Sequence, residues 1–181
     1  FALPARGNRI RLIEAIDGEL MTRSTEASVA VQNGQAISDV RQDILKIAVI
    51  NRYSKAKPAV AFIRGFGLQE GALASCVGHD SHNIIAVGAD DESLCRAANL
   101  IIEHKGGISA VGKDREHILP LPVAGIMSDD DGFAVAEQYQ AIDDFAKAQL
   151  GSRLGAPFMT LSFMALLVIP TLKLSDRGLF D

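Results

Sequence analysis

Two short apolar runs, Ala72–Val77 and Ile84–Val87, constrain the fold of this chain more than any other feature. Apolar segments of this length, bounded by glycine and polar residues, are typical of buried β-strands. The polar segment between them, His79–Asn83, is therefore predicted to be a loop held between two core strands. Loops anchored in this way are rigid, and functional groups are often displayed on them.

The residues of this loop can carry chemistry. Two of the four histidines of the chain and one carboxylate fall within it. An imidazole can ligate a metal or take up a proton near neutral pH, and Asp80 can orient an imidazole or act as a base. Ser81 and Asn83 can exchange hydrogen bonds with a polar ligand. We predict His79, Asp80 and His82 as catalytic residues and Ser81 and Asn83 as substrate-binding residues.

Two other interpretations of the loop remain open at this stage. His79 and His82, together with Asp80, are a plausible ligand set for manganese, iron or zinc, although so short a loop must bend sharply to bring them together. Alternatively, the loop is a polar turn whose side chains bind only their own backbone.

The beginning of the chain has a hairpin pattern. Residues 8–16 alternate loosely between apolar and polar, the dipeptide Asp17-Gly18 is a strong turn signal, and residues 19–25 can return as the second strand. We therefore predict a β-hairpin segment within residues 1–34.

Helical patterns follow the apolar runs. A helix is predicted from Asp90 or Asp91 to about His104, and the glycine pair Gly106-Gly107 ends it. A second amphipathic helix follows the acidic run Asp129–Asp131, where negative charge favours a helix N-terminus. Strands first and strand–helix–strand units later predict an α+β fold, with a mostly antiparallel sheet packed into a sandwich.

The overall composition excludes some functions. The net charge is −4, no Lys/Arg cluster is present and there is no Trp, which argues against nucleic-acid binding. The longest apolar stretch near the end, Phe163–Ile169, is too short to span a bilayer, so no membrane association is expected. Cys76 and Cys95 lack metal or redox spacing, which favours reduced thiols in a cytoplasmic protein, with a disulfide between them left open.

Several stretches resemble the C-terminal domain of bacterial adenine deaminases, from about residue 40 to the end. The most specific is the His-Asp-Ser-His-Asn block within His79–Gly88. Less specific apolar stretches also match, namely Gly65–Leu68, Gly71–Ser75, Leu119–Ser128, Ser162–Leu166, Val168–Pro170 and Leu172–Leu174. Leu167 departs from the pattern, since a proline is expected there.

The resemblance implies an activity and a missing partner. Such enzymes are amidohydrolase-like proteins that convert adenine to hypoxanthine and ammonia. Their manganese or iron is held in an N-terminal barrel by a His-x-His pair, a carboxylate, further histidines and an aspartate. This sequence has no His-x-His pair, and a (β/α)₈ barrel needs about 200 residues or more. The resemblance therefore implies a single C-terminal domain over residues 1–181, without a barrel and inactive alone.

Three functions are then compatible with the sequence. The first is a contribution of the His79–Asn83 loop to an active site completed by the N-terminal barrel, with adenine as substrate. The second is a local metal site on the same loop. The third is a packing or homo-oligomerisation module whose interface is the apolar tail around Phe158, Phe163 and Met164, although a core role is the more ordinary interpretation of that tail. The chain begins without Met, which suggests a part of something longer.

Overall fold

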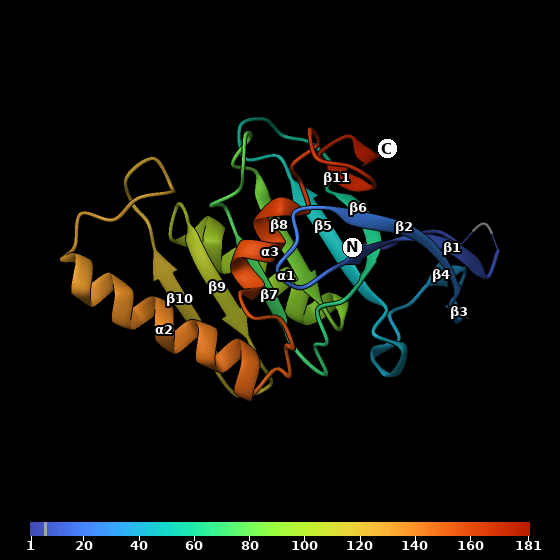
Figure 1. The fold of residues 1–181 in the computed structure, drawn as a ribbon, viewed down its shortest axis with the longest axis horizontal. Coiled ribbons are helices and arrows are strands. Elements are labelled where there is room, and N and C mark those ends of the chain that lie inside the picture. Colours follow the sequence, from blue (N-terminus) through green and yellow to red (C-terminus); the bar gives the residue numbers. More distant parts are fainter. Residues whose placement is uncertain (6) are drawn as a thin grey trace.

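The computed structural model describes residues 1–5 and 7–181 and is built on an eight-stranded sheet with the order β10-β9-β7-β8-β5-β6-β1-β2 (Figure 1). The strands are β1 (Arg9–Ala15), β2 (Thr22–Ser28), β5 (Leu45–Ile50), β6 (Ala59–Arg64), β7 (Ala72–Ser75), β8 (Ile84–Gly88), β9 (Gly107–Val111) and β10 (Glu116–Pro120). Neighbouring strands are antiparallel except β1 and β6, which pair in parallel. The predicted α+β class with a mostly antiparallel sheet is confirmed, and the described residues form no barrel.

Helices and two small hairpins complete the described part of the chain. They are α1 (Asp91–Glu103), α2 (Gly132–Ala148), α3 (Pro157–Phe163), a 3₁₀ turn (Val40–Gln42), β3 (Val31–Gln32) with β4 (Gln35–Ala36), and β11 (Lys173–Ser175) with β12 (Gly178–Phe180). No helix in the described ranges is long and apolar enough to cross a membrane.

Helix α1 covers one face of the sheet between β8 and β9. Its N-terminus is capped by Asp90, whose carboxylate accepts a hydrogen bond from the Ser93 backbone N–H at 2.8 Å. Leu94, Ala98 and Ile101 form its buried stripe against the small residues of β7 and β8. The helix predicted from this cap and this spacing is confirmed.

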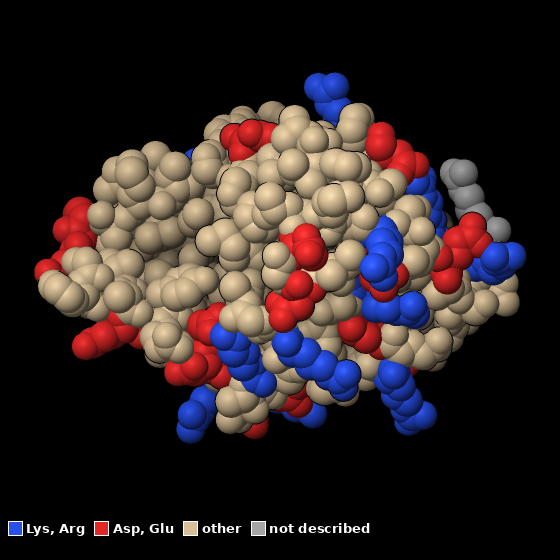
Figure 2. Space-filling view, in the orientation of Figure 1, with Lys and Arg blue, Asp and Glu red and all other residues tan. Residues whose placement is uncertain are grey.

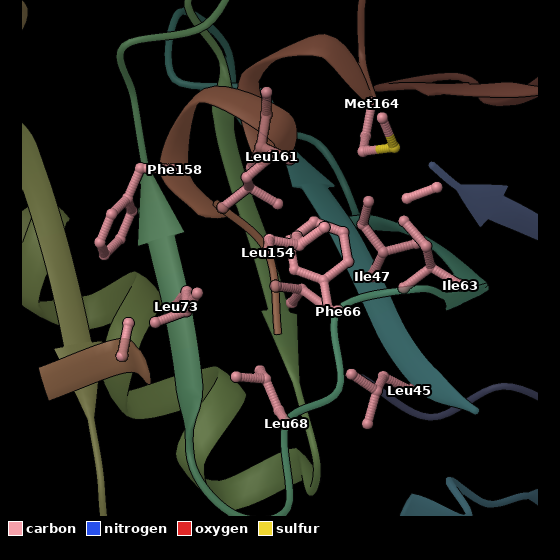
Figure 3. Close-up of a cluster of buried hydrophobic side chains, with 14 of the residues drawn as sticks. Leu45, Ile47, Ile63, Phe66, Leu68, Leu73, Leu154, Phe158, Leu161 and Met164 are labelled. Carbon is pink, nitrogen blue, oxygen red and sulfur yellow. The ribbon is translucent and has the colours of Figure 1, made fainter. Parts of the chain in front are cut away.

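Helix α3 lies on the opposite face of the sheet, and α2 packs against β9 and β10 (Figure 1). Figure 3 shows Phe158, Leu161 and Met164 of this region among the side chains of the sheet, close to Ile47 and Leu73. All five are buried, and each such side chain contributes roughly 1.5–3 kcal/mol by leaving water. The core interpretation of the apolar tail is therefore right for Phe158 and Met164, and this burial excludes them as an exposed interface.

A bend after β6 depends on a carboxylate that precedes β5. Asp43 accepts hydrogen bonds from the backbone N–H groups of Gly65 at 2.8 Å and Gly67 at 2.9 Å. Gly65 has φ +106°, and a Cβ there would lie 2.3 Å from the Ala15 carbonyl oxygen. The bend directs Phe66 into the core, where it is fully buried.

The N-terminal hairpin is an integral part of the main sheet. Strands β1 and β2 pair antiparallel from Arg9–Ser28 to Ala15–Thr22, inside the predicted segment 1–34. Because β1 also pairs with β6, through Leu12–Phe62 and its neighbours, the hairpin extends the sheet rather than standing apart from it.

Both cysteines are free thiols. Cys76 is buried; its Sγ accepts from the Gly107 N–H at 3.1 Å and lies 2.8 Å from the Gly125 carbonyl oxygen. Cys95 is exposed on α1. The disulfide left open by the sequence is thus not formed, and Cys76 is a small core residue, as expected.

Candidate functional site

The His79–Asn83 loop is a tight turn between β7 and β8. The Ser81 backbone N–H donates to the His79 carbonyl at 3.0 Å, which closes a three-residue turn around Asp80. Asp80 has φ +65° and His82 has φ +50°, both in the left-handed region. Asp, Asn and His are the non-glycine side chains that enter this region most readily. Part of the polar composition of the loop therefore follows from its backbone conformation alone.

The residues after β5 support the loop from one side. The Tyr53 hydroxyl donates to the Ser81 carbonyl at 2.7 Å, and the Arg52 backbone N–H donates to the Asn83 side-chain oxygen at 3.3 Å. The Arg52 guanidinium lies 5.1 Å from the centre of the Tyr53 ring. Asn83 is only 5% exposed, so its side-chain oxygen holds the loop in place.

Helix α3 supports the loop from the other side. The Ser162 Oγ lies 3.1 Å from the His79 Nδ1, and the Phe163 ring packs on the imidazole with a centroid distance of 4.4 Å. Ser162 is buried, whereas His79 remains exposed. The imidazole is therefore held at one ring nitrogen and one face, while the rest of the ring is accessible to a ligand.

The loop and α3 border a cavity of about 480 Å³. His79, Asp80 and His82 line one side of it. The remaining lining residues are Ser75, Val77, Gly78, Ile108, Tyr139, Phe158, Met159 and Ser162. A small-molecule site commonly combines an apolar wall with a few convergent polar groups, in a volume of about 300–1,000 Å³. The structure thus brings together the three predicted catalytic residues, whereas Ser81 and Asn83 do not line this cavity.

The Tyr139 side chain of α2 lies on the apolar side of the cavity, next to Phe158 at 6.1 Å between ring centres. Burial raises the pKa of the Tyr139 phenol above its usual value, and the neighbouring Asp143 carboxylate adds to this effect. The hydroxyl therefore stays protonated and can donate a hydrogen bond at neutral pH.

His82 is the least satisfied group of the loop. Its Nδ1 is buried and has no hydrogen-bond partner in the described part of the chain. A buried polar atom without a partner costs roughly 1–3 kcal/mol, and native proteins keep few of them. His82 lines the cavity, but this nitrogen is itself shielded, so a ligand would reach it only if the loop moved.

The loop does not form a metal site by itself. Within residues 1–5 and 7–181, no group of three or more His, Cys, Asp or Glu side chains is arranged to hold a metal ion. His79 and His82 are thus not joined by a third ligand in this conformation, and their role as metal ligands stays a prediction. The manganese or iron that the resemblance implies for an N-terminal barrel likewise stays a prediction.

Two other cavities have similar volumes, about 470 and 490 Å³. The first lies beside Arg52, Lys105 and Cys76, and the second lies between α1 and the β9–β10 turn. Neither is lined by residues of the His79–Asn83 loop, which sets the cavity beside α3 apart as the candidate site.

Comparison with known proteins agrees with the resemblance seen in the motifs. The family described as adenine deaminase C-terminal domain matches residues 19–181. The chain belongs to this family. Adenine deaminases of Salinibacter ruber, Methanothermobacter thermautotrophicus and a Sulfurovum species are 53%, 49% and 54% identical to it, over 100%, 95% and 94% of the chain. These alignments cover 33%, 32% and 31% of the relatives, so the chain spans about a third of their length.

Sequence reasoning missed several residues around the site of this C-terminal domain. The sequence places Ser162 only within a stretch that resembles the family, and it gives Tyr139 no role at the site. Met159 was not singled out at all, and Phe163 was assigned to the tail. The pattern contains no local signal for their role, because α3 meets the loop from 83 residues further along the chain.

Proposed function

We propose that this chain is the C-terminal part of an adenine deaminase, which converts adenine and water to hypoxanthine and ammonia. In this proposal the His79–Asn83 loop contributes to an active site that the N-terminal part of the enzyme completes. The observation that carries the proposal is the cavity in which His79, Asp80 and His82 face an apolar wall.

The shape and chemistry of the cavity suit a purine base. Adenine is planar and presents both hydrogen-bond acceptors, such as N7, and a donor, its exocyclic amine. The wall of Tyr139, Phe158 and Met159 can pack against the ring. The Asp80 carboxylate can accept from the amine, and the histidines can exchange hydrogen bonds with the ring nitrogens.

In this proposal the metal ion is bound outside this chain. A manganese or iron ion would be held by residues of the N-terminal barrel, since the described residues of this chain offer no three-ligand group. The role of the C-terminal residues is then to bind and orient the base and to hold protons near it.

The surface around the cavity supports a covering partner. Figure 2 shows a hollow to the left of α3 whose surface is mostly uncharged; Lys and Arg lie mainly along the lower and right-hand edges, while acidic groups also lie at the left end, at the top and near the centre of the molecule. Met159, on this side, is 51% exposed. An uncharged surface with exposed apolar side chains is typical of an interface. We propose that the N-terminal part of the same enzyme covers it.

The test is substitution in the full-length enzyme. Asp80→Asn and His82→Ala are each expected to lower kcat/KM for adenine by about 10²–10⁴-fold. Asp114→Asn is the matched control, because Asp114 is an exposed residue of the β9–β10 turn at the opposite end of the sheet. If both loop variants keep the wild-type rate and adenine affinity, the proposed role of the loop is wrong.

A second experiment separates the domain from the enzyme. This chain alone is expected to release no ammonia from adenine with manganese present, while addition of the matching N-terminal part restores activity. Ammonia release by the chain alone would instead place a complete active site on the described residues.

A further inference from the structure

The hydroxyl of Ser162 lies between two partners. Its Oγ is 2.7 Å from the Met159 carbonyl oxygen, within the same helix, and 3.1 Å from the His79 Nδ1. Ser162 is 3% exposed, so the described contacts rather than bulk water satisfy this hydroxyl.

Ser162 has one hydroxyl proton, so it can donate to only one of these two partners. A carbonyl oxygen can only accept, and two oxygens 2.7 Å apart without a proton between them would repel each other. The Ser162 proton therefore points to Met159, a common arrangement for serine within a helix. The Oγ then offers a lone pair to His79, and 3.1 Å is an ordinary distance for an N–H···O bond. The proton of this second bond must come from Nδ1.

We propose that Ser162 is a positioning residue that fixes His79 with its proton on Nδ1. The neutral ring then carries its lone pair on Nε2, the nitrogen for which the described residues supply no hydrogen bond. In the doubly protonated ring Nδ1 also donates, so the contact with Ser162 persists in both protonation states.

Phe163 restricts the ring further. Its side chain lies against the imidazole with a tilt of 31° between the two planes, which limits rotation of His79 about its side-chain bonds. Two consecutive residues of α3 thus set both the plane of the imidazole and the position of its proton. In many active sites a histidine is oriented in this way, by a group that hydrogen-bonds the ring nitrogen facing away from the ligand.

The consequence for the reaction rests on the proposed function. An Nε2 lone pair can accept a hydrogen bond from the exocyclic amine of adenine or from a purine ring N–H, but it cannot donate one to a ring acceptor. In the neutral ring Ser162 therefore makes Nε2 an acceptor, which restricts the edge of the purine that His79 can recognise.

The first test measures the tautomer directly on this chain. Two-bond ¹H–¹⁵N spectra of the histidine rings, recorded at about pH 8.5 and thus well above the ordinary histidine pKa of about 6.5, distinguish protonation of Nδ1 from that of Nε2. The His79 signals are assigned from their loss in His79→Gln. We expect the Nδ1–H form in the wild type and in Ser162→Thr, and a shift toward the Nε2–H form in Ser162→Ala. The matched control is Thr160→Val, which removes a neighbouring hydroxyl of α3 and should leave the His79 signals unchanged.

An Nε2–H form in the wild type, or an unchanged Nδ1–H form in Ser162→Ala, would overturn the proposal. The second test is kinetic: Ser162→Ala in the full-length enzyme should lower kcat/KM for adenine by about 10- to 100-fold, while Ser162→Thr keeps most of the activity. A tautomer that shifts in Ser162→Ala without any kinetic effect would support the positioning role of Ser162 and count against the proposed function of His79.

Discussion

Because Lys173 is buried, we expect the free energy of unfolding to rise with pH. This residue of β11 is fully buried, and its ammonium group donates to the Leu20 carbonyl at 2.7 Å, with no carboxylate partner in the described chain. Burial lowers the pKa of Lys173 from 10.5 to about 8. Between these two values the unfolded chain binds more protons than the folded chain, so folding becomes more favourable as the pH increases.

The size of the effect follows from the two pKa values. Burial of Lys173 lowers the free energy of unfolding by about 3 kcal/mol at pH 7, where the group is charged in both states, and by about 1.4 kcal/mol at pH 9.5, where it is mostly neutral in the folded chain; the difference is about 2 kcal/mol. Lys173 is itself buried, but the β11–β12 hairpin that carries it lies at the edge of the molecule (Figure 1), so nearby water can lower the difference to about 1 kcal/mol.

The assay is urea unfolding of the wild type and of Lys173→Met at both pH values. The variant has no group to titrate here, so other groups that change with pH cancel in the comparison. Relative to the variant, the wild type should gain about 1–2 kcal/mol of unfolding free energy between pH 7 and pH 9.5. A difference between the two proteins that does not change with pH would refute the reasoning.

Two further predictions concern the bend after β6. Gly65→Ala should cost about 3 kcal/mol or more in unfolding free energy, because its Cβ would meet the Ala15 carbonyl at 2.3 Å in a left-handed backbone; Gly132→Ala, with open space around its Cβ, is the control and should change stability by less than about 1 kcal/mol. Asp43→Asn should cost about 1–3 kcal/mol in the same assay, because only one acceptor oxygen remains for the N–H groups of Gly65 and Gly67. Wild-type stability of Asp43→Asn would show that the two bonds are not needed for the bend.

The sequence predicted the elements whose signals are local. The apolar runs of β7 and β8, the Asp90 cap of α1 and the acidic start of α2 each act through residues a few positions apart. Asp131, the last residue of the acidic run, caps α2 by accepting a hydrogen bond from the Phe133 N–H at 3.0 Å, so the run lies at a helix N-terminus as predicted.

The arrangement of those elements was beyond the sequence, because it depends on contacts between distant segments. The parallel pairing of β1 with β6 and the wall that α2 and α3 form beside the loop have no local pattern. Within the loop, only the structure distinguishes the residues that face the cavity from those that hold the turn. His79, Asp80 and His82 line the cavity, while the Asn83 side chain accepts a hydrogen bond that holds the turn. Polar residues at adjacent positions in a tight turn point in different directions, which spacing alone does not reveal.

The contrast between the two cysteines makes the molecule easy to label. A thiol-reactive dye should modify the exposed Cys95 and leave the buried Cys76 intact. Since Cys95 lies on α1, across the sheet from α3 and its cavity, the attached fluorophore would leave the candidate site undisturbed. The native chain thus carries a single thiol for a reporter, and fluorescence anisotropy from it would test association with the proposed N-terminal part without any engineered residue.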